Sequence, residues 1–180
     1  MTIDWKHIDI KNLAAIVLKT LKKKNIDALL VGGACISIYT DNKYISGDLD
    51  FISYATLKEL SEALQEIGFQ RESSRHFRRD DCPFFIEFVS PPPAVGSEPI
   101  SSRNEIKTRH GKIVLLTPTD AVRDRLAAYY HWNDPQALEQ AAMVTEAQKV
   151  DLKEVRRWSL QEGFKEKYDS FVARLRGKKQ

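Results

Sequence analysis

The sequence predicts an α+β fold, in which a strand-rich first part is followed by a helical second part. Between residues 28 and 116, short apolar segments are bounded by glycines, prolines and polar turns, as is typical of strands. From residue 118 on, four segments show helical spacing of apolar residues, and three of them open with Thr or Asp in an N-cap position. We therefore predict an α/β core over 1–117 and a helical C-terminal region over 118–180 that packs on the core.

The first elements alternate between amphipathic helices and short strands. Apolar residues recur at three- and four-residue intervals over 10–21, which predicts a helix with lysines on its other side. The run "DALLV" predicts a strand that ends at Gly32 and Gly33, and "ACISIYT" has room for about two helical turns. "GDLDFISY" then predicts a strand with one polar face, and "TLKELSEALQEIGF" a helix from the N-cap Thr56 to Gly68.

Sequence patterns predict strands in the middle of the chain and helices at its end. "FQRESSRHFRRDD" and "CPFFIEFVSPPP" are interpreted as two strands joined by a polar turn, the second ended by three prolines. "NEIKTRHGKIVLLT" predicts a hairpin that turns at His110 and Gly111. The predicted helices are "TPTDAVRDRLAAYYHW", "DPQALEQAAMVTEAQ", "DLKEVRRWSLQEG" and "KEKYDSFVARLR".

Composition places the chain among ordinary soluble proteins. It has 180 residues, of which 42% are hydrophobic and 29% charged, and its net charge of +3 does not demand a nucleic-acid partner. Apolar runs fall short of the roughly 20 residues that a membrane span needs, and "MTIDWKHIDIKN" lacks the apolar stretch of a secretory signal. We expect a cytoplasmic protein with no membrane partner. Cys35 and Cys82 are expected to be buried or half-buried free thiols.

The basic residues are clustered, which leaves two interpretations open. Such runs are either solvated faces or the contact surface of a phosphate-rich partner. The clusters are Arg71, Arg75, Arg78 and Arg79 in mid-chain, and Lys165, Lys167, Arg174, Arg176, Lys178 and Lys179 near the C-terminus.

Two aspartates on alternate residues, Asp48 and Asp50, predict a metal site. Alternate side chains of a strand share a face and lie about 7 Å apart along it, so two unpaired carboxylates there would repel each other. A hard divalent cation such as Mg²⁺, or Mn²⁺, removes that conflict and prefers oxygen ligands. The alternative is a solvent-exposed turn that carries two chance carboxylates.

Glu87 is the candidate third carboxylate of a two-metal centre. It lies in the apolar stretch "PFFIEFVS" and is the only charged residue between Asp81 and Glu98. An isolated charge in an apolar strand is costly unless it is paired or bound to metal. The alternative is a salt bridge to one of the four mid-chain arginines.

Gly32 and Gly33 are candidate phosphate-binding residues. They lie where a strand turns into a helix, so backbone N–H groups at the helix N-terminus are free to bind phosphate. Ser46, just before the aspartates, offers a hydroxyl on the same rim. Arg78 is either a phosphate or acceptor contact or a charge that keeps an edge strand soluble.

These residues together resemble the DNA polymerase β-type nucleotidyltransferase superfamily. Within it, "VGGACISIY" followed by "YISGDLDFI" and the helical end are similar to the abortive-infection and toxin–antitoxin nucleotidyltransferases of the AbiEii type. The resemblance implies a mixed sheet with flanking helices, an NTP substrate with Mg²⁺, and transfer of a nucleotide to a hydroxyl of RNA such as tRNA, of a protein or of a small molecule. It places Gly32 and Gly33 in the phosphate loop and makes Asp48, Asp50 and Glu87 metal ligands.

The helical part resembles the AbiEii-type enzymes in layout. Their lysine-containing motif is not found, and "DAVRDRLAAYYHWND" stands in its region, so Arg123 or Arg125 is the candidate for the triphosphate contact. The alternative to an active enzyme is a fold retained as a binding or regulatory module, antitoxin-like, with a cognate protein partner and weak or lost activity. RNA binding without catalysis, suggested by the basic C-terminus, is a third possibility.

Overall fold

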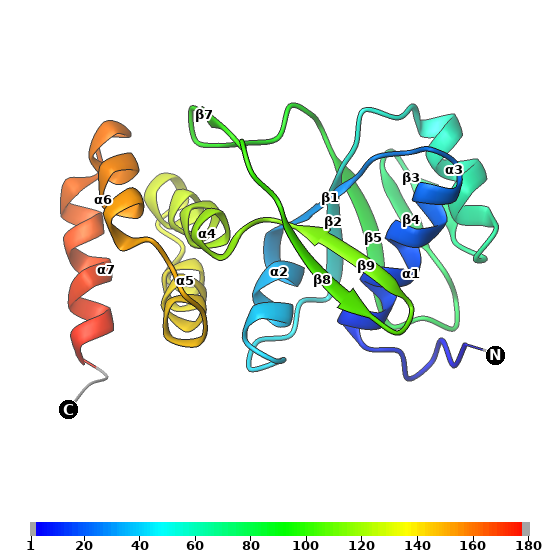
Figure 1. The fold of residues 1–180 in the computed structure, drawn as a ribbon, viewed down its shortest axis with the longest axis horizontal. Helices are drawn as coiled ribbons and strands as arrows, with labels where there is room; N and C mark the ends of the chain where they lie inside the picture. Colours follow the sequence, from blue (N-terminus) through cyan, green and yellow to red (C-terminus); the bar gives the residue numbers. More distant parts are fainter. Residues whose placement is uncertain (1–2, 178–180) are drawn as a thin grey trace.

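A computed structural model describes residues 3–177, so Lys178 and Lys179 of the basic C-terminal run lie outside the described residues. A mixed sheet and its helices are followed by a wholly helical part (Figure 1). The elements are α1 (Ile10–Lys23), β1 (Leu29–Val31), α2 (Gly32–Tyr39), β2 (Asp48–Ile52), α3 (Leu57–Gln65), β3 (Gln70–Ser73), β4 (His76–Arg78), β5 (Phe85–Val89), β6 (Ala94–Val95), β7 (Glu98–Pro99), β8 (Asn104–Thr108), β9 (Gly111–Leu115), α4 (Pro118–Trp132), α5 (Pro135–Ala147), α6 (Leu152–Gln161) and α7 (Lys165–Gly177).

The main sheet is mixed and has seven strands in the order β3-β4-β5-β2-β1-β9-β8. Strand β2 lies in the middle, antiparallel to β1 and parallel to β5. Strands β1 and β9 are parallel, whereas the outer pairs β3–β4, β4–β5 and β8–β9 are antiparallel. This architecture confirms the predicted α+β class.

One face of the sheet is buried beneath α1 and α3. Leu49 and Phe51 of β2 are fully buried, as are Phe77 of β4 and Phe88 of β5, and the ring of Phe88 contacts those of Phe51 and Phe77. Helix α1 packs on β9 and on α3, and α3 packs on β3, so the two helices span this face. Their apolar stripes complete the core. The alternate residues of β2 and β5 therefore point to the opposite face of the sheet.

The helical part begins and ends where local signals predict. Thr117, Asp134 and Asp151 are the N-caps of α4, α5 and α6, and each side chain accepts a hydrogen bond from a backbone N–H of the first turn. Helices α4 and α5 pack on α2, and Gln148 Nε2 donates to the backbone carbonyl of Tyr39 over 2.8 Å. The helical part thus packs on the core, while its status as a separate domain stays a prediction.

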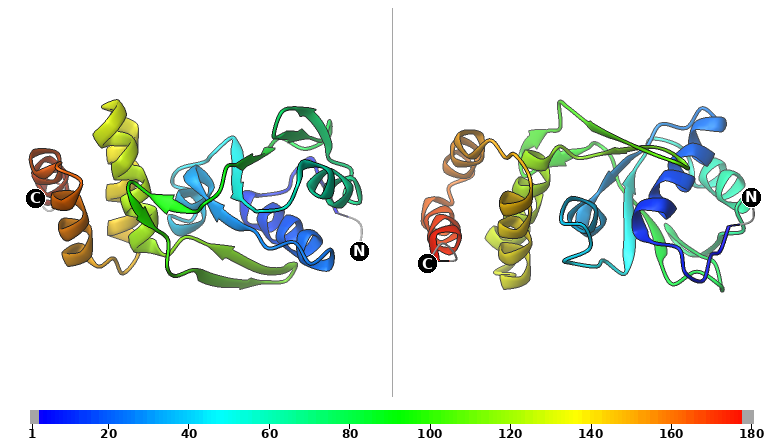
Figure 2. Two further views of the ribbon diagram at one scale, coloured as in Figure 1. Left: turned by 90° about the horizontal axis from the view of Figure 1, so that it is seen from above. Right: turned by 60° about the horizontal axis from the view of Figure 1, so that its bottom comes forward.

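The molecule is elongated, with α6 and α7 at one end and α1 and α3 at the other (Figure 2). Within residues 3–177, helices with the length and apolar character to cross a bilayer are absent. Cys35 and Cys82 are both buried and free, as predicted.

Two hairpins differ from the sequence prediction. The segment interpreted as one strand over 69–81 is the hairpin β3–β4, which turns at Ser74 with a φ of 23° and carries a register shift between Arg71 and Ser73. The short hairpin β6–β7 was not predicted. Each of these strands is only two to four residues long, which is too short for the alternation of apolar and polar residues to be recognised. The first hairpin places β4 beside β5, and it thereby shapes the site described below.

Candidate active site

Three carboxylates converge on the open face of β2 and β5. In this parallel pair Asp50 lies opposite Glu87, and Asp48 precedes Asp50 on the same face. One ligand oxygen from each of the three side chains lies within 4.8 Å of those of the other two. The structure therefore brings together the three acids that the sequence singled out, although Glu87 lies 37 and 39 positions after Asp50 and Asp48 in the chain.

Asp50 carries the electrostatic cost of this arrangement. Burial, together with the neighbouring charges of Asp48 and Glu87, raises the pKa of its carboxyl to about 7, although the charge of Arg125 partly opposes them. A divalent cation offsets such a cost because it takes carboxylate oxygens as ligands and neutralises their mutual repulsion. The donor set of Asp48, Asp50 and Glu87 thus fits Mg²⁺ or Mn²⁺.

Gly32 packs directly against this centre. It is the first residue of α2 and has a φ of +67°, and a Cβ built on it would lie 2.3 Å from Asp50 Oδ2. A side chain at this position would therefore displace the carboxylate. No side chain of the described residues caps the N-terminus of α2, and helix N-termini of this kind are favourable seats for phosphate, so phosphate binding by Gly32 and Gly33 stays a prediction.

Gly33 and Ser46 support Asp48. A Cβ on Gly33 would lie 2.8 Å from Ser46 Oγ, and that hydroxyl donates a hydrogen bond to Asp48 Oδ1 over 2.8 Å. The backbone N–H of Ser46 in turn donates to Ser37 Oγ of α2. Ser46 is therefore an orienting residue for Asp48, which refines its predicted place in nucleotide binding.

The helical part contributes a positively charged side chain, that of Arg125, to the pocket beside Asp50. Arg125 of α4 donates to Asp124 Oδ2 from Nη2 over 2.6 Å and from Nε over 3.0 Å. Both residues line a pocket of about 290 Å³ together with Gly32 and Asp50. Of the two arginines considered for the triphosphate contact, Arg125 is the one that the fold brings to the carboxylates.

Arg123, by contrast, is buried among acidic residues of the helical part and of β7. It donates to Asp120 Oδ1 over 3.0 Å and to Glu98 Oε2 over 2.5 Å, and its guanidinium lies over the ring of Trp158. Glu154 lies 3.7 Å away. These contacts occupy the side chain, so the structure does not bring Arg123 to the site where the sequence had suggested it.

Replacing Arg123 with methionine is expected to destabilise the protein by about 3–5 kcal/mol, because buried carboxylates would lose their counter-charge. Urea unfolding measures the change. The control is Arg157→Met, since the exposed Arg157 also binds Glu98 and Glu154, and its loss is expected to change stability little. Equal stability of the two variants would contradict a structural role for Arg123.

His76, for which the sequence favoured a structural contact over a role at the site, is a direct neighbour of Glu87. It lies opposite Glu87 in the β4–β5 pair, and its Nε2 is 3.0 Å from Glu87 Oε1. The ion-pair partner found for Glu87 in the described chain is thus this histidine and not a mid-chain arginine. Alternation of polar and apolar residues in "HFR" was the available signal, but it required recognition of β4 as a strand.

For the nucleotide transfer that the sequence predicts, we expect His76→Ala to lower kcat about tenfold and to leave KM for the NTP unchanged, because one contact that orients Glu87 is lost. His76→Gln, which keeps an N–H donor, should restore most of the rate. The comparison variant is His110→Ala, in the β8–β9 turn. A change in KM or thermal stability without a change in kcat would contradict this positioning role.

The raised pKa of Asp50 predicts how stability depends on pH when no metal is bound. An unfolded Asp ionises near pH 4 and the folded one near pH 7, so between these values the folded state binds more protons and stability falls as pH rises. In a chelating buffer, the Tm of Asp50→Asn should exceed that of the native protein by a margin that widens from pH 5 to pH 8. Scanning calorimetry measures it, and a constant margin would contradict the shift.

Comparison with solved structures identifies the fold as that of the nucleotidyltransferases. An antigenic nucleotidyltransferase-like protein from Paracoccidioides brasiliensis matches with a TM-score of 0.59 and 15% identity over 77% of this chain and 76% of its own. The antibiotic-resistance factor ANT(2'')-Ia matches with a TM-score of 0.53 in solution, at 13% identity over 93% and 95% of the two chains.

The crystal structure of ANT(2'')-Ia in complex with adenylyl-2''-tobramycin gives a TM-score of 0.54, at 12% identity over 92% of this chain and 97% of that one. Protein-family models do not match the sequence, and a search of curated proteins finds no match. The similarity to these solved structures is therefore a similarity of fold.

Proposed function

We propose that the protein is a metal-dependent nucleotidyltransferase that moves NMP from an NTP to a hydroxyl of an acceptor. The observation that carries this proposal is the set of Asp48, Asp50 and Glu87 on one face of the sheet, with Gly32 against Asp50. A scaffold without catalysis has no physical reason to hold three like charges together. The fold, shared with nucleotidyltransferases of solved structure, supports the same reaction class.

Asp48, Asp50 and Glu87 would hold Mg²⁺ or Mn²⁺, which, when bound, supplies positive charge that activates the acceptor and stabilises the departing pyrophosphate. The N–H groups at the start of α2, opened by Gly32, bind the β- and γ-phosphates. Arg125 releases Asp124 and donates to the triphosphate, because a phosphate oxygen is an alternative charged partner.

The transfer is an in-line displacement at the α-phosphorus. The acceptor oxygen bonds to this phosphorus while the bond to the bridging oxygen of pyrophosphate breaks, and the hydroxyl proton passes to the carboxylate of Glu87. Ser46 holds Asp48 in orientation during the reaction, and His76 holds Glu87. Pyrophosphate leaves toward the N-terminus of α2.

We further propose an abortive-infection or toxin–antitoxin setting of the AbiEii type, in the cytoplasm and with a cognate protein partner. The glycine pair, the alternate aspartates and the trailing helical part support it. Acceptors to test are RNA, protein and small molecules that carry hydroxyl groups. The last of these is suggested by the adenylyl-2''-tobramycin bound to ANT(2'')-Ia.

The proposal is tested with α-³²P-labelled NTPs, Mg²⁺ or Mn²⁺, and either total RNA or cell lysate, using the native protein and the Asp48→Asn/Asp50→Asn variant. Label that enters RNA or a protein band with the native protein alone supports the transferase and names its acceptor class. If neither protein transfers label and calorimetry shows no binding of the metal–NTP complex, the catalytic function is wrong.

A further inference from the structure

An exposed aromatic ring lies beside the three carboxylates. Phe85 of β5 is opposite Asp48 in the β2–β5 register, and 40% of its surface is exposed. The other phenylalanines of these strands, Phe51 and Phe88, are fully buried on the opposite face. An apolar ring left in solvent on the functional face of a sheet is available to contact a ligand.

Strand β4 adds a cation to this ring. The register pairs His76 with Glu87 and Phe77 with Ile86, so the next residue, Arg78, falls beside Phe85 on the face of the carboxylates. The guanidinium carbon of Arg78 lies 5.3 Å from the centre of the Phe85 ring. Its ion pair with Glu72 is 3.8 Å long and half exposed, so the charge remains available. We call Phe85 and Arg78 the platform.

The platform lies on the acceptor side of the proposed reaction centre. The N-terminus of α2, which receives the leaving pyrophosphate, follows β1 on one side of β2, whereas β5 and β4 lie on the other side. An in-line displacement requires the attacking oxygen to arrive opposite the leaving group. The acceptor hydroxyl must therefore approach over β5 and β4, where the platform is exposed.

We propose that the platform binds the unpaired end of a nucleic acid strand and that a hydroxyl of this end is the acceptor. Aromatic rings and arginine planes stack on unpaired bases, and arginine also pairs with phosphate. This inference rests on the proposed function and names the acceptor class for that site.

Binding is tested without NTP, so that it is independent of transfer. Fluorescence anisotropy compares a labelled 12-nucleotide RNA strand, the same sequence as DNA, and the RNA in a duplex. We expect the RNA strand to bind more tightly than the duplex. Binding of the DNA strand that is equal to or weaker than that of the RNA strand agrees with the platform. Phe85→Ala should raise the Kd about tenfold, since stacking on one base contributes about 1–3 kcal/mol, and Arg78→Gln should raise Kd and reduce its salt dependence.

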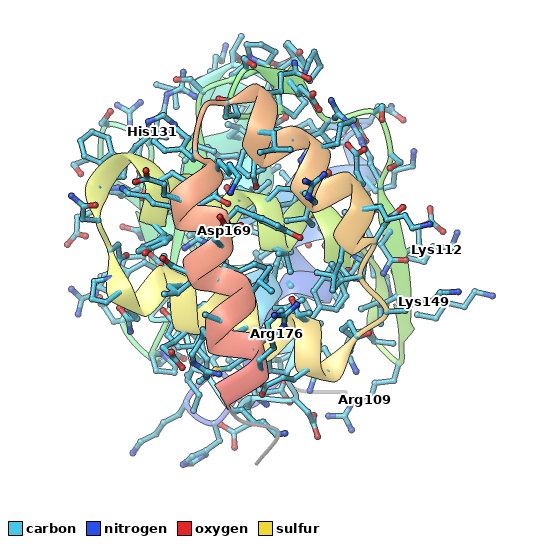
Figure 3. All side chains as sticks on the ribbon, turned by 90° about the vertical axis from the view of Figure 1, so that its left-hand side faces the viewer. Arg109, Lys112, His131, Lys149, Asp169 and Arg176 are labelled. Atoms are coloured by element: carbon cyan, nitrogen blue, oxygen red, sulfur yellow. The ribbon has the colours of Figure 1, made fainter. Side chains whose placement is uncertain are left out.

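Two control variants lie far from the platform. Trp132→Ala removes a ring that is 81% exposed at the end of α4, and Arg176→Gln removes a charge of α7 at the far end of the molecule (Figure 3). Both should leave the Kd unchanged. Circular dichroism verifies that each variant is folded, which we expect because all four side chains are exposed or half exposed.

The platform is wrong if single strands bind no more tightly than the duplex, or if the Kd responds to Arg176→Gln and not to Phe85→Ala. Transfer of label to a protein or small molecule, without strand binding, also overturns the platform but leaves the transferase standing. Strand binding that depends on Phe85, in a protein that transfers no label to any acceptor, supports the platform and overturns the proposed reaction instead.

Discussion

Replacing Asp50 with asparagine is expected to lower nucleotide transfer about a thousandfold or more while the protein stays folded. Asparagine has the shape of aspartate but lacks its charge, so the site loses a ligand for the cation that offsets several kcal/mol of developing charge. The three carboxylates repel each other, and burial raises the pKa of Asp50 to about 7, so this variant should be at least as stable as the native protein in the absence of metal.

Single-turnover transfer with a labelled NTP measures the rate, and urea unfolding measures stability. Asp169→Asn is the matched control, because Asp169 is an aspartate of α7 at the far end of the molecule from the site (Figure 3). The control should transfer at the native rate. An Asp50→Asn protein with native activity would show that the carboxylate cluster is not the reaction centre.

Gly32→Ala is expected to lower transfer about a hundredfold and to destabilise the protein as well. The added Cβ would lie 2.3 Å from Asp50 Oδ2, and the carboxylate must move to accommodate it. A displacement of about 1 Å of a reacting group can reduce a rate about a hundredfold. Alanine at a φ of +67° adds a backbone cost of about 1–2 kcal/mol.

Gly47→Ala is the control for this substitution. Gly47 directly precedes Asp48, yet a Cβ built on it meets no atom of the described chain within 4 Å. Its transfer rate and its midpoint of urea unfolding should stay close to native values. If both glycine variants lose the same activity, close packing of Gly32 against Asp50 is not the cause.

Local signals in the sequence were sufficient for the long elements. Helices α1 and α3 to α6 follow from apolar spacing and from N-cap residues such as Thr56 and Thr117, because those interactions lie within the helix itself. The helix α2 was predicted to follow the glycine pair, and it begins at the first of the two glycines. Short strands have no such internal signal, which is why β4 was merged with its neighbour and β6 and β7 were missed.

The sequence by itself determined the α+β class and singled out Asp48, Asp50 and Glu87, because a charge in an apolar strand is costly unless something offsets it. Only the tertiary structure decided which partners these acids meet. Pairing of β4 with β5 brings His76 to Glu87 and Arg78 to Phe85, and packing of α4 brings Arg125 to Asp50 while it buries Arg123 among acids. Such contacts join residues far apart in the chain, so they follow from strand register and helix packing, which local sequence patterns do not specify.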